Sequence, residues 1–211
     1  MVLFDIDHTL LDTDKLRKCI QYKRLPALFG VSALELEKIT AKYTSTLKSS
    51  IEFSPRVYVQ FLVERLKLER NIQKIALEFF LNNERDFKAA LFAEVLSSLE
   101  RLSKEFLLGI FSEGDLEFQQ AKLEKSGIKK FFKPELVFIF PSKANELKVI
   151  EGKIKNYQGP AFIVDDNIDH IRRIMDTRFI PILLDRRGKY KQFGDCLLID
   201  DLSQLMTLAP I

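Results

Sequence analysis

Paired acidic side chains stand at the start of the sequence, in the segment FDIDHTLLDTD. Asp5 and Asp7 are separated by one residue inside an otherwise apolar run. In an extended strand two such side chains point to the same face, and at the carboxyl end of a strand they lie where open α/β sheets bind ligands. A single Asp often ends a strand as a turn former, but that role explains two within one apolar run poorly. The spacing therefore indicates a functional site.

A second acidic pair closes another apolar run, in the segment AFIVDDN. Asp165 and Asp166 end the run, and Asp169 follows in the first turn of a predicted helix. Carboxylates gathered at two strand ends repel one another unless protons or a cation neutralise them. Oxygen ligands favour a hard cation, and Mg²⁺ is the natural choice where phosphate oxygens share its coordination. For Asp169, an exposed position near the positive end of the helix dipole is an equally good interpretation.

Two further predicted strand ends carry groups suited to an anion. The segment FLLGIFS ends on Ser112, whose hydroxyl and following backbone N–H groups could hold a phosphate, although Ser is also a common helix cap. Lys143 follows the run LVFIF where a helix is expected to begin. A cation is unfavourable at that end of a helix dipole, so an anionic partner is expected for Lys143. Lys148 falls within the same helix and is expected to face solvent.

These strand ends belong to a longer alternation of strands and helices. Continuous apolar runs predict strands at 2–7, 106–112, 136–140, 161–166, 180–185 and 196–200. Amphipathic segments between them predict helices at 93–103, 115–127, 143–156, 168–176 and 201–208. Buried strands that alternate with helices are typical of a parallel sheet covered on both faces. We therefore expect a doubly wound, Rossmann-like α/β fold.

The stretch between the first and second predicted strands differs in character. From about Asp14 to Phe92 the apolar spacing is that of amphipathic helices, most clearly at 33–43, 56–68 and 71–87. We expect an all-helical domain at 14–92, inserted into an α/β core that comprises 1–13 and 93–211.

Composition and charge limit the possible functions. The 211 residues contain 33 Lys and Arg against 30 Asp and Glu with the signs interspersed, so nothing favours nucleic-acid binding. No apolar run approaches the roughly 18 residues of a membrane-spanning helix. Residues 1–11 lack the basic start of a signal peptide, and the two cysteines, Cys19 and Cys196, suggest neither a disulfide framework nor a zinc site. We expect a cytoplasmic protein with no membrane partner.

Taken together, the motifs resemble those of the haloacid dehalogenase (HAD) superfamily, in the subgroup with a helical cap inserted after the first strand. The segment DIDHT matches the first motif of the superfamily, Asp-x-Asp-x-Thr. Ser112, Lys143 and the segment VDDNID follow in the order and approximate spacing of the second, third and fourth motifs. His8 is a departure, because most of these enzymes have Gly at that position.

The resemblance implies a role for each motif residue. Asp5 would be the nucleophile that attacks phosphorus, and Asp7 the general acid for the leaving group and then the base for water. Thr9 would contact the phosphate or fix the loop, and Ser112 and Lys143 would hold the phosphoryl oxygens. Mg²⁺ would be bound by the Asp5 carboxylate, the Asp7 backbone carbonyl and Asp166, with Asp165 as a further ligand or as a group that orients a metal-bound water.

The implied activity is Mg²⁺-dependent hydrolysis of a small-molecule phosphate monoester through a phosphoaspartate, by a monomer or weak homodimer. A phosphotransferase of the β-phosphoglucomutase kind is the alternative, since it uses the same site and differs in its cap. Asp7 argues against a dehalogenase proper, because that reaction has no phosphoryl leaving group to protonate. The segment IVDDN also resembles the acidic pair of response-regulator receivers, but receivers carry that pair on their first strand. A binding protein with a dead site is disfavoured because no motif residue is missing.

Overall fold

The structure, a computed structural model, describes residues 1–194 and 196–208 of the chain. Six strands form one sheet in the order β3-β2-β1-β4-β5-β6, and every neighbouring pair is parallel. The strands are β1 (Val2–Phe4), β2 (Leu108–Glu113), β3 (Val137–Phe140), β4 (Phe162–Asp165), β5 (Ile180–Leu184) and β6 (Leu197–Ile199). The doubly wound parallel fold predicted from the sequence is confirmed.

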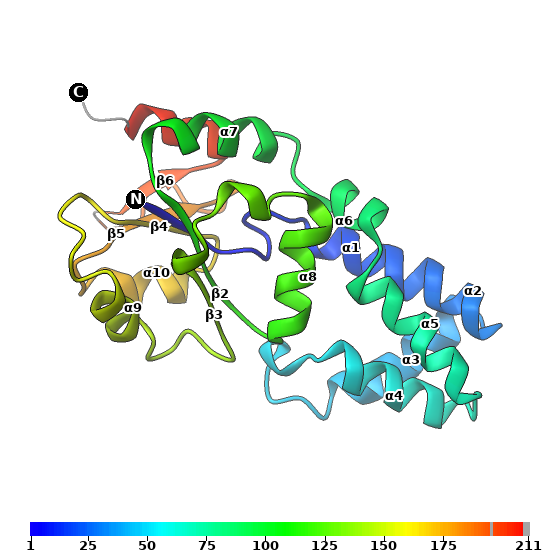
Figure 1. Ribbon diagram of the computed structural model, residues 1–211. Coiled ribbons are helices and arrows are strands. Elements are labelled where there is room, and N and C mark those ends of the chain that lie inside the picture. The colour runs from blue at the N-terminus through cyan, green and yellow to red at the C-terminus, as the bar shows by residue number, and fades with distance from the viewer. Residues whose placement is uncertain (195, 209–211) are drawn as a thin grey trace.

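The sheet is buried on both faces. Alternate residues of each strand point to opposite sides, so they pack into two different apolar clusters. In β1, Val2 and Phe4 pack into one apolar cluster, whereas Leu3 packs into another. The first cluster involves α7 (Val95–Glu105), α8 (Leu116–Ser126) and the 3-10 segment η5 (Leu202–Leu208), and the second involves α9 (Leu147–Lys153) and α10 (Ile168–Ile174). Figure 1 shows α7 on one side of the sheet and α9 and α10 on the other.

Helix α8 shows how local sequence sets both ends of an element. Asp115 caps its N-terminus by accepting a hydrogen bond from the Phe118 backbone N–H (2.9 Å), and Gly127 ends it with φ 82°. Its bounds agree with the prediction. Two other predicted helices differ from the structure: the 143–156 helix is confined to α9, and the 201–208 segment is the 3-10 segment η5.

The stretch between β1 and α7 is helical, as predicted, and we call residues 13–90 the helical insertion. It contains α1 (Thr13–Cys19), the π-helical segment η1 (Ile20–Arg24), α2 (Leu25–Phe29), α3 (Ala33–Thr44), the 3-10 turn η2 (Ser50–Glu52), α4 (Pro55–Arg65), α5 (Arg70–Leu81) and α6 (Glu84–Ala90). The single amphipathic stretch 71–87 is divided between α5 and α6, because the Asn83 side chain accepts from the Asp86 N–H (3.3 Å) and caps a new helix.

The helical insertion packs on α8, which lies between it and the sheet (Figure 1). On α8, the Phe118 ring lies 5.9 Å from the ring of Phe80 and 6.3 Å from those of Phe53 and Phe87, between centroids. All three partners belong to the insertion. The apolar core therefore continues from the sheet through α8 into the insertion without a break. Among the described residues, no helix is both long enough and apolar enough to cross a lipid bilayer.

Candidate active site

The loop after β1 carries the first acidic pair. The Asp5 backbone N–H donates to the Val164 carbonyl (2.9 Å), which extends the ladder between β1 and β4 by one bond. The chain then turns tightly, since the Leu11 N–H donates back to the Ile6 carbonyl (3.0 Å). His8 lies in this turn with φ 57°, the left-handed conformation that Gly adopts most easily. The loop thus takes a glycine-type backbone at the position where the sequence departs from the family pattern.

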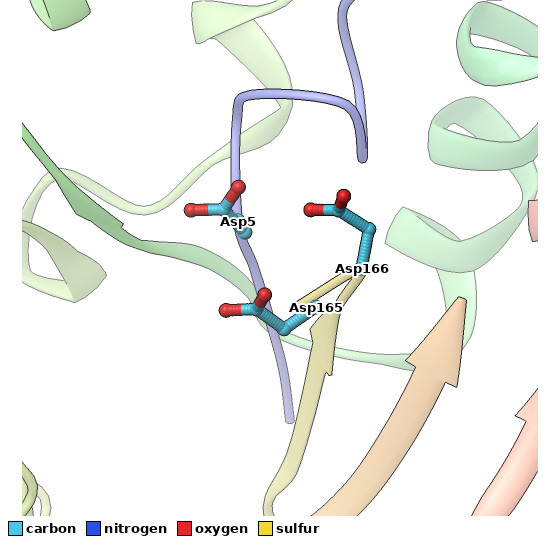
Figure 2. A group of neighbouring side chains, drawn as sticks. All are labelled: Asp5, Asp165 and Asp166. Atoms are coloured by element: carbon cyan, nitrogen blue, oxygen red, sulfur yellow. The ribbon is translucent and has the colours of Figure 1, made fainter. Parts of the chain in front are cut away.

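Three carboxylates from two neighbouring strand ends meet at one edge of the sheet. Asp5 follows β1, and Asp165 and Asp166 lie at the end of β4 (Figure 2). One oxygen atom of each lies within 4.8 Å of the others, a spacing that suits a shared metal ion. Asp5 and Asp165 are buried and Asp166 is half-buried. The structure thus brings together the carboxylates that the sequence pattern placed at two separate strand ends.

Lys143 is the cation at the centre of this cluster. Its Nζ donates to Asp5 Oδ1 (2.6 Å) and to Asp165 Oδ2 (2.7 Å), and its side chain is 3% exposed. Burial opposes its charge, but the two carboxylates outweigh burial and raise the pKa of Lys143. The anionic partner expected from the sequence is present. The expected helix start is wrong, because α9 begins only at Leu147 and Lys143 lies in the loop before it.

The acidic cluster is short of positive charge despite Lys143. Burial raises the pKa of Asp5 to about 6, against the opposing effect of Lys143 and with a contribution from Asp165. Burial also raises the pKa of Asp166 to about 7, reinforced by the charges of Asp5 and Asp165. A second cation among these oxygens would favour the ionised form of both groups.

Glu113, His170 and Asp165 form a ring of polar contacts with Lys143. Glu113 Oε2 accepts from the Lys143 backbone N–H (2.8 Å), and Glu113 Oε1 lies 3.3 Å from His170 Nε2. His170 Nδ1 lies 3.0 Å from Asp165 Oδ2, which accepts from Lys143 Nζ. Burial lowers the pKa of His170, but the hydrogen bonds to Asp165 and Glu113 outweigh burial and raise it to about 9. Protonated His170 therefore joins two carboxylates, and Lys143 is held at its backbone and at its ammonium group.

Asp7 lies near the cluster but is bound by other partners. Lys122 Nζ contacts both Asp7 oxygens, at 2.6 and 2.8 Å, and Gln119 Nε2 donates to Oδ2 at 2.8 Å. The Thr13 hydroxyl donates to Oδ1. The Asp7 side chain is 29% exposed, and its partial burial disfavours the ionised form. The charge of Lys122 and the hydrogen bonds from Lys122, Thr13 and Gln119 outweigh this effect and lower the pKa of Asp7 to about 2.

The remaining predicted residues differ in their surroundings. Ser112 Oγ and Thr9 Oγ1 are buried, and neither has a hydrogen-bond partner among the described residues. The Thr9 carbonyl accepts from Arg186 Nη2 (2.8 Å), which ties the loop after β1 to the loop after β5. Asp169 is exposed and pairs with Arg172 (2.7 Å), so it lies outside the carboxylate cluster. Ser112 is therefore a buried hydroxyl near the end of β2 that has no hydrogen-bond partner among the described residues.

The sequence patterns missed several contributors to the site. They are Glu113, Gln119, Lys122, His170 and Arg186. Weak signals existed: Glu113 directly follows a predicted site residue, and His170 falls one helical turn after Asp166. Gln119 and Lys122 are three residues apart and so share one face of α8. Nothing local to α8 shows that this polar face is buried.

The strand order places the site at a defined point of the fold. In the order β3-β2-β1-β4-β5-β6, chain direction across the sheet reverses between β1 and β4, where Asp5 and Asp165 meet. Doubly wound α/β proteins bind ligands at this switch point. Fold and site thus define an α/β enzyme with acidic residues at its switch point. The chain belongs to the haloacid dehalogenase-like hydrolase family, whose model matches residues 2–139.

Solved structures of the same family share the fold across the whole chain. A HAD phosphatase from Thermococcus onnurineus is similar with 20% identity and a TM-score of 0.62, over 98% of this chain and 96% of that one. The putative HAD-hydrolase YfnB from Bacillus subtilis, bound to magnesium, has 17% identity and a TM-score of 0.64, over 100% of this chain and 98% of that one. A 2-haloacid dehalogenase from Pseudomonas syringae has 22% identity and a TM-score of 0.61, over 98% of this chain and 96% of that one. No curated protein sequence matches the chain.

Proposed function

We propose that this hydrolase is a Mg²⁺-dependent phosphatase that cleaves a small-molecule phosphate monoester through a phosphoaspartate on Asp5. The observation that carries the proposal is the meeting of three carboxylates around one buried lysine at the switch point of the sheet. A phosphate ester adds further negative charge to a site where Asp5 and Asp166 already have raised pKa values. Such a substrate needs a cation to accompany it.

The side chains present fit a magnesium ion. Lys143 occupies one oxygen of Asp5 and one of Asp165, which leaves the second Asp5 oxygen and the Asp166 carboxylate as donors. Mg²⁺ prefers oxygen donors and keeps several waters, so few protein ligands suffice. Asp5, Asp166 and the Asp7 backbone carbonyl would hold it, with Asp165 as a further ligand or as a group that orients a bound water. When bound, the ion offsets the charge of the phosphoryl oxygens.

The chain's own residues can then perform two displacements at phosphorus. An Asp5 oxygen attacks phosphorus while the bond to the ester oxygen breaks. Asp7 is ionised beside Lys122 and first takes up a proton from solvent, which it then donates to the ester oxygen. Asp7 next takes a proton from water, whose oxygen attacks the phosphorus of the acyl phosphate and releases inorganic phosphate and Asp5. Lys143 and the unpartnered Ser112 hydroxyl would hold the phosphoryl oxygens. Thr9 would fix the loop.

The helical insertion would act as a cap over this chemistry. Under this proposal residues 14–92 form the cap, and residues 1–13 and 93–211 form the catalytic core. α1 starts directly after the loop that carries Asp5 and Asp7, so the cap begins at the edge of the site. A cap in this position excludes water and selects the alcohol part of the ester.

Dehalogenation uses the same fold and is the activity to be distinguished. A halide leaves carbon without needing a proton, so a dehalogenase has no use for a second acidic residue in the position of Asp7. It also has no anionic phosphoryl group that requires a cation among the carboxylates. The retained Asp7 and the acidic cluster therefore favour a phosphate ester.

Turnover of two model substrates separates these activities. We expect p-nitrophenyl phosphate to be hydrolysed with Mg²⁺ and not in excess EDTA, and we expect no halide release from 2-chloropropionate. With an activated aryl phosphate, acid quench and intact mass spectrometry, the Asp7→Asn enzyme should carry an added phosphoryl group and Asp5→Asn should carry none. Chelator-resistant turnover, halide release or equal labelling of the two variants would contradict the proposal.

A further inference from the structure

The Asp7 carboxylate has no acceptor position to spare. A carboxylate accepts about four hydrogen bonds, two at each oxygen. Oδ1 accepts from the Thr13 hydroxyl and from Lys122 Nζ (2.6 Å), and Oδ2 accepts from Gln119 Nε2 (2.8 Å) and again from Lys122 Nζ (2.8 Å). One of these donors must yield before Asp7 can contact the ester oxygen of a substrate.

Lys122 is the donor least able to leave. Its side chain is 3% exposed, and its Nζ lies 4.4 Å from the centroid of the Phe118 ring. Among the described residues, the hydrogen bonds of its ammonium group go to Asp7 alone. A buried ammonium that loses its partner is strongly unfavourable, whereas a neutral hydroxyl bond such as that of Thr13 is easily exchanged. Thr13 is thus the contact that a substrate can replace, and the Lys122 contact persists.

Gln119 connects this pair to the strand that ends at the site. Its Nε2 donates to Asp7 and also to the Glu113 carbonyl (2.5 Å), at the end of β2. Gln119 is 2% exposed and lies one helical turn before Lys122 on α8. The orientation of Asp7 is therefore set from one rigid helix that is itself anchored to β2.

We propose that Lys122 is a positioning residue for the hydrolysis reaction, acting through Asp7, whose carboxylate it holds in one orientation beside Asp5 with the support of Gln119. This proposal rests on the proposed function, in which Asp7 donates and accepts protons. Lys122 does not touch the substrate, because its ammonium group is turned to Asp7 and covered by Phe118. Removing Lys122 should slow the steps that use Asp7 and leave the others unchanged.

The kinetic signature follows from the role of Asp7. Lys122→Met keeps the side-chain length and removes the ammonium group. Because misplacing a catalytic group by about 1 Å costs up to about 100-fold, we expect kcat for an alkyl phosphate to fall roughly 10- to 100-fold. KM should change by no more than about threefold, since Lys122 makes no contact with substrate. An aryl phosphate with a good leaving group needs no proton in the first step and should show a smaller loss in its phosphorylation rate.

The test is a double-mutant cycle with Asp7→Asn. We expect Lys122→Met to add no loss of rate in the Asp7→Asn background, with Lys125→Met on the same helix as the matched control that behaves as wild type. Gln119→Leu keeps the ion pair between Lys122 and Asp7, and we expect it to lower kcat in the same way but less strongly. It replaces Lys122→Met as the test variant if Lys122→Met does not fold. Equal losses of the phosphorylation rate for both substrates, a further loss in the Asp7→Asn background, or a Lys122→Met enzyme faster than wild type would overturn the proposal.

Crystal structures provide a readout that does not depend on activity. Wild-type protein that turns over no phosphate monoester refutes the proposed function, and the positioning claim is then decided by the Asp7 side chain alone. We expect one Asp7 orientation in wild type and Lys125→Met, and a different or multiple orientation in Lys122→Met. An unchanged Asp7 in Lys122→Met shows that Thr13 and Gln119 suffice and refutes the positioning role.

Discussion

Gly109 is the second residue of β2, where the sheet has no room for a side chain. It pairs with Leu3 of β1 in the parallel register. A Cβ atom at Gly109 would lie 2.5 Å from the Leu136 carbonyl oxygen, 2.6 Å from Leu136 Cβ and 2.6 Å from Leu3 Cδ2. Two of these three atoms are backbone or directly attached to it, so the neighbouring segments themselves must move. We predict that Gly109→Ala destabilises the protein through this overpacking.

The size of the effect follows from the contacts. Overpacking of a well-packed core costs about 1–3 kcal/mol, and contacts with backbone belong at the upper end, so we expect a loss of about 2–3 kcal/mol. For a chain of this length each kcal/mol shifts Tm by about 2–4 °C, which predicts a decrease of about 4–12 °C in a thermal melt followed by circular dichroism. Because β2 carries Ser112 and Glu113 at its end, turnover should fall as well.

A second glycine provides a control of opposite sign. Gly152 lies in α9, and a Cβ atom there would meet nothing within 4 Å. Gly152→Ala should therefore stabilise the protein by about 0.5–1 kcal/mol, because alanine favours the helix and restricts the unfolded chain. If Gly109→Ala melts within about 2 °C of wild type or above it, the packing argument for β2 is wrong. A Gly152→Ala protein that melts below wild type would contradict the argument for α9.

Three further predictions concern charges in the site. The raised pKa of His170 should stabilise the fold fully below its ordinary value of 6.5, and this effect should be lost as pH rises through about 9. In EDTA, the difference in unfolding free energy between wild type and His170→Asn should therefore fall over this range and level off above it; a difference that does not change with pH would contradict this. Saturating Mg²⁺ should raise Tm of wild type and Asp169→Asn by several degrees and that of Asp166→Asn by much less; equal shifts would place the metal elsewhere. Lys143→Met should cost about 3 kcal/mol in denaturant unfolding without metal, because it leaves the buried Asp5 carboxylate without its cation; an unchanged midpoint would contradict this.

The sheet and its carboxylates could be predicted because their signals are local. A parallel strand covered on both faces reads as a continuous apolar run, and the residues that end such runs must lie at one edge of the sheet. Asp5 and Asp165 were located in this way. The end of α8 at Gly127 was equally readable, because its left-handed conformation favours glycine.

Other parts of the site depend on contacts that no local pattern records. Lys122 and Asp7 are 115 positions apart, and only the packing of α8 on the sheet brings them together. The sequence predicts a helix start at Lys143 because the apolar spacing of 143–156 indicates a helix but does not mark the residue at which it begins. The conformation at Lys143 instead follows from Glu113, which binds the Lys143 backbone N–H from β2.

The contact of Phe118 with the helical insertion matters for protein engineering. By chain order α8 belongs with the sheet, but its aromatic face packs among Phe53, Phe80 and Phe87 of the insertion. The salt bridge from Arg56 in α4 to Glu117 in α8 spans the same boundary. A chimera that exchanges residues 13–90 with those of a related hydrolase would leave this face of α8 against a surface it does not match. A functional chimera must therefore transplant the outward face of α8 together with the insertion.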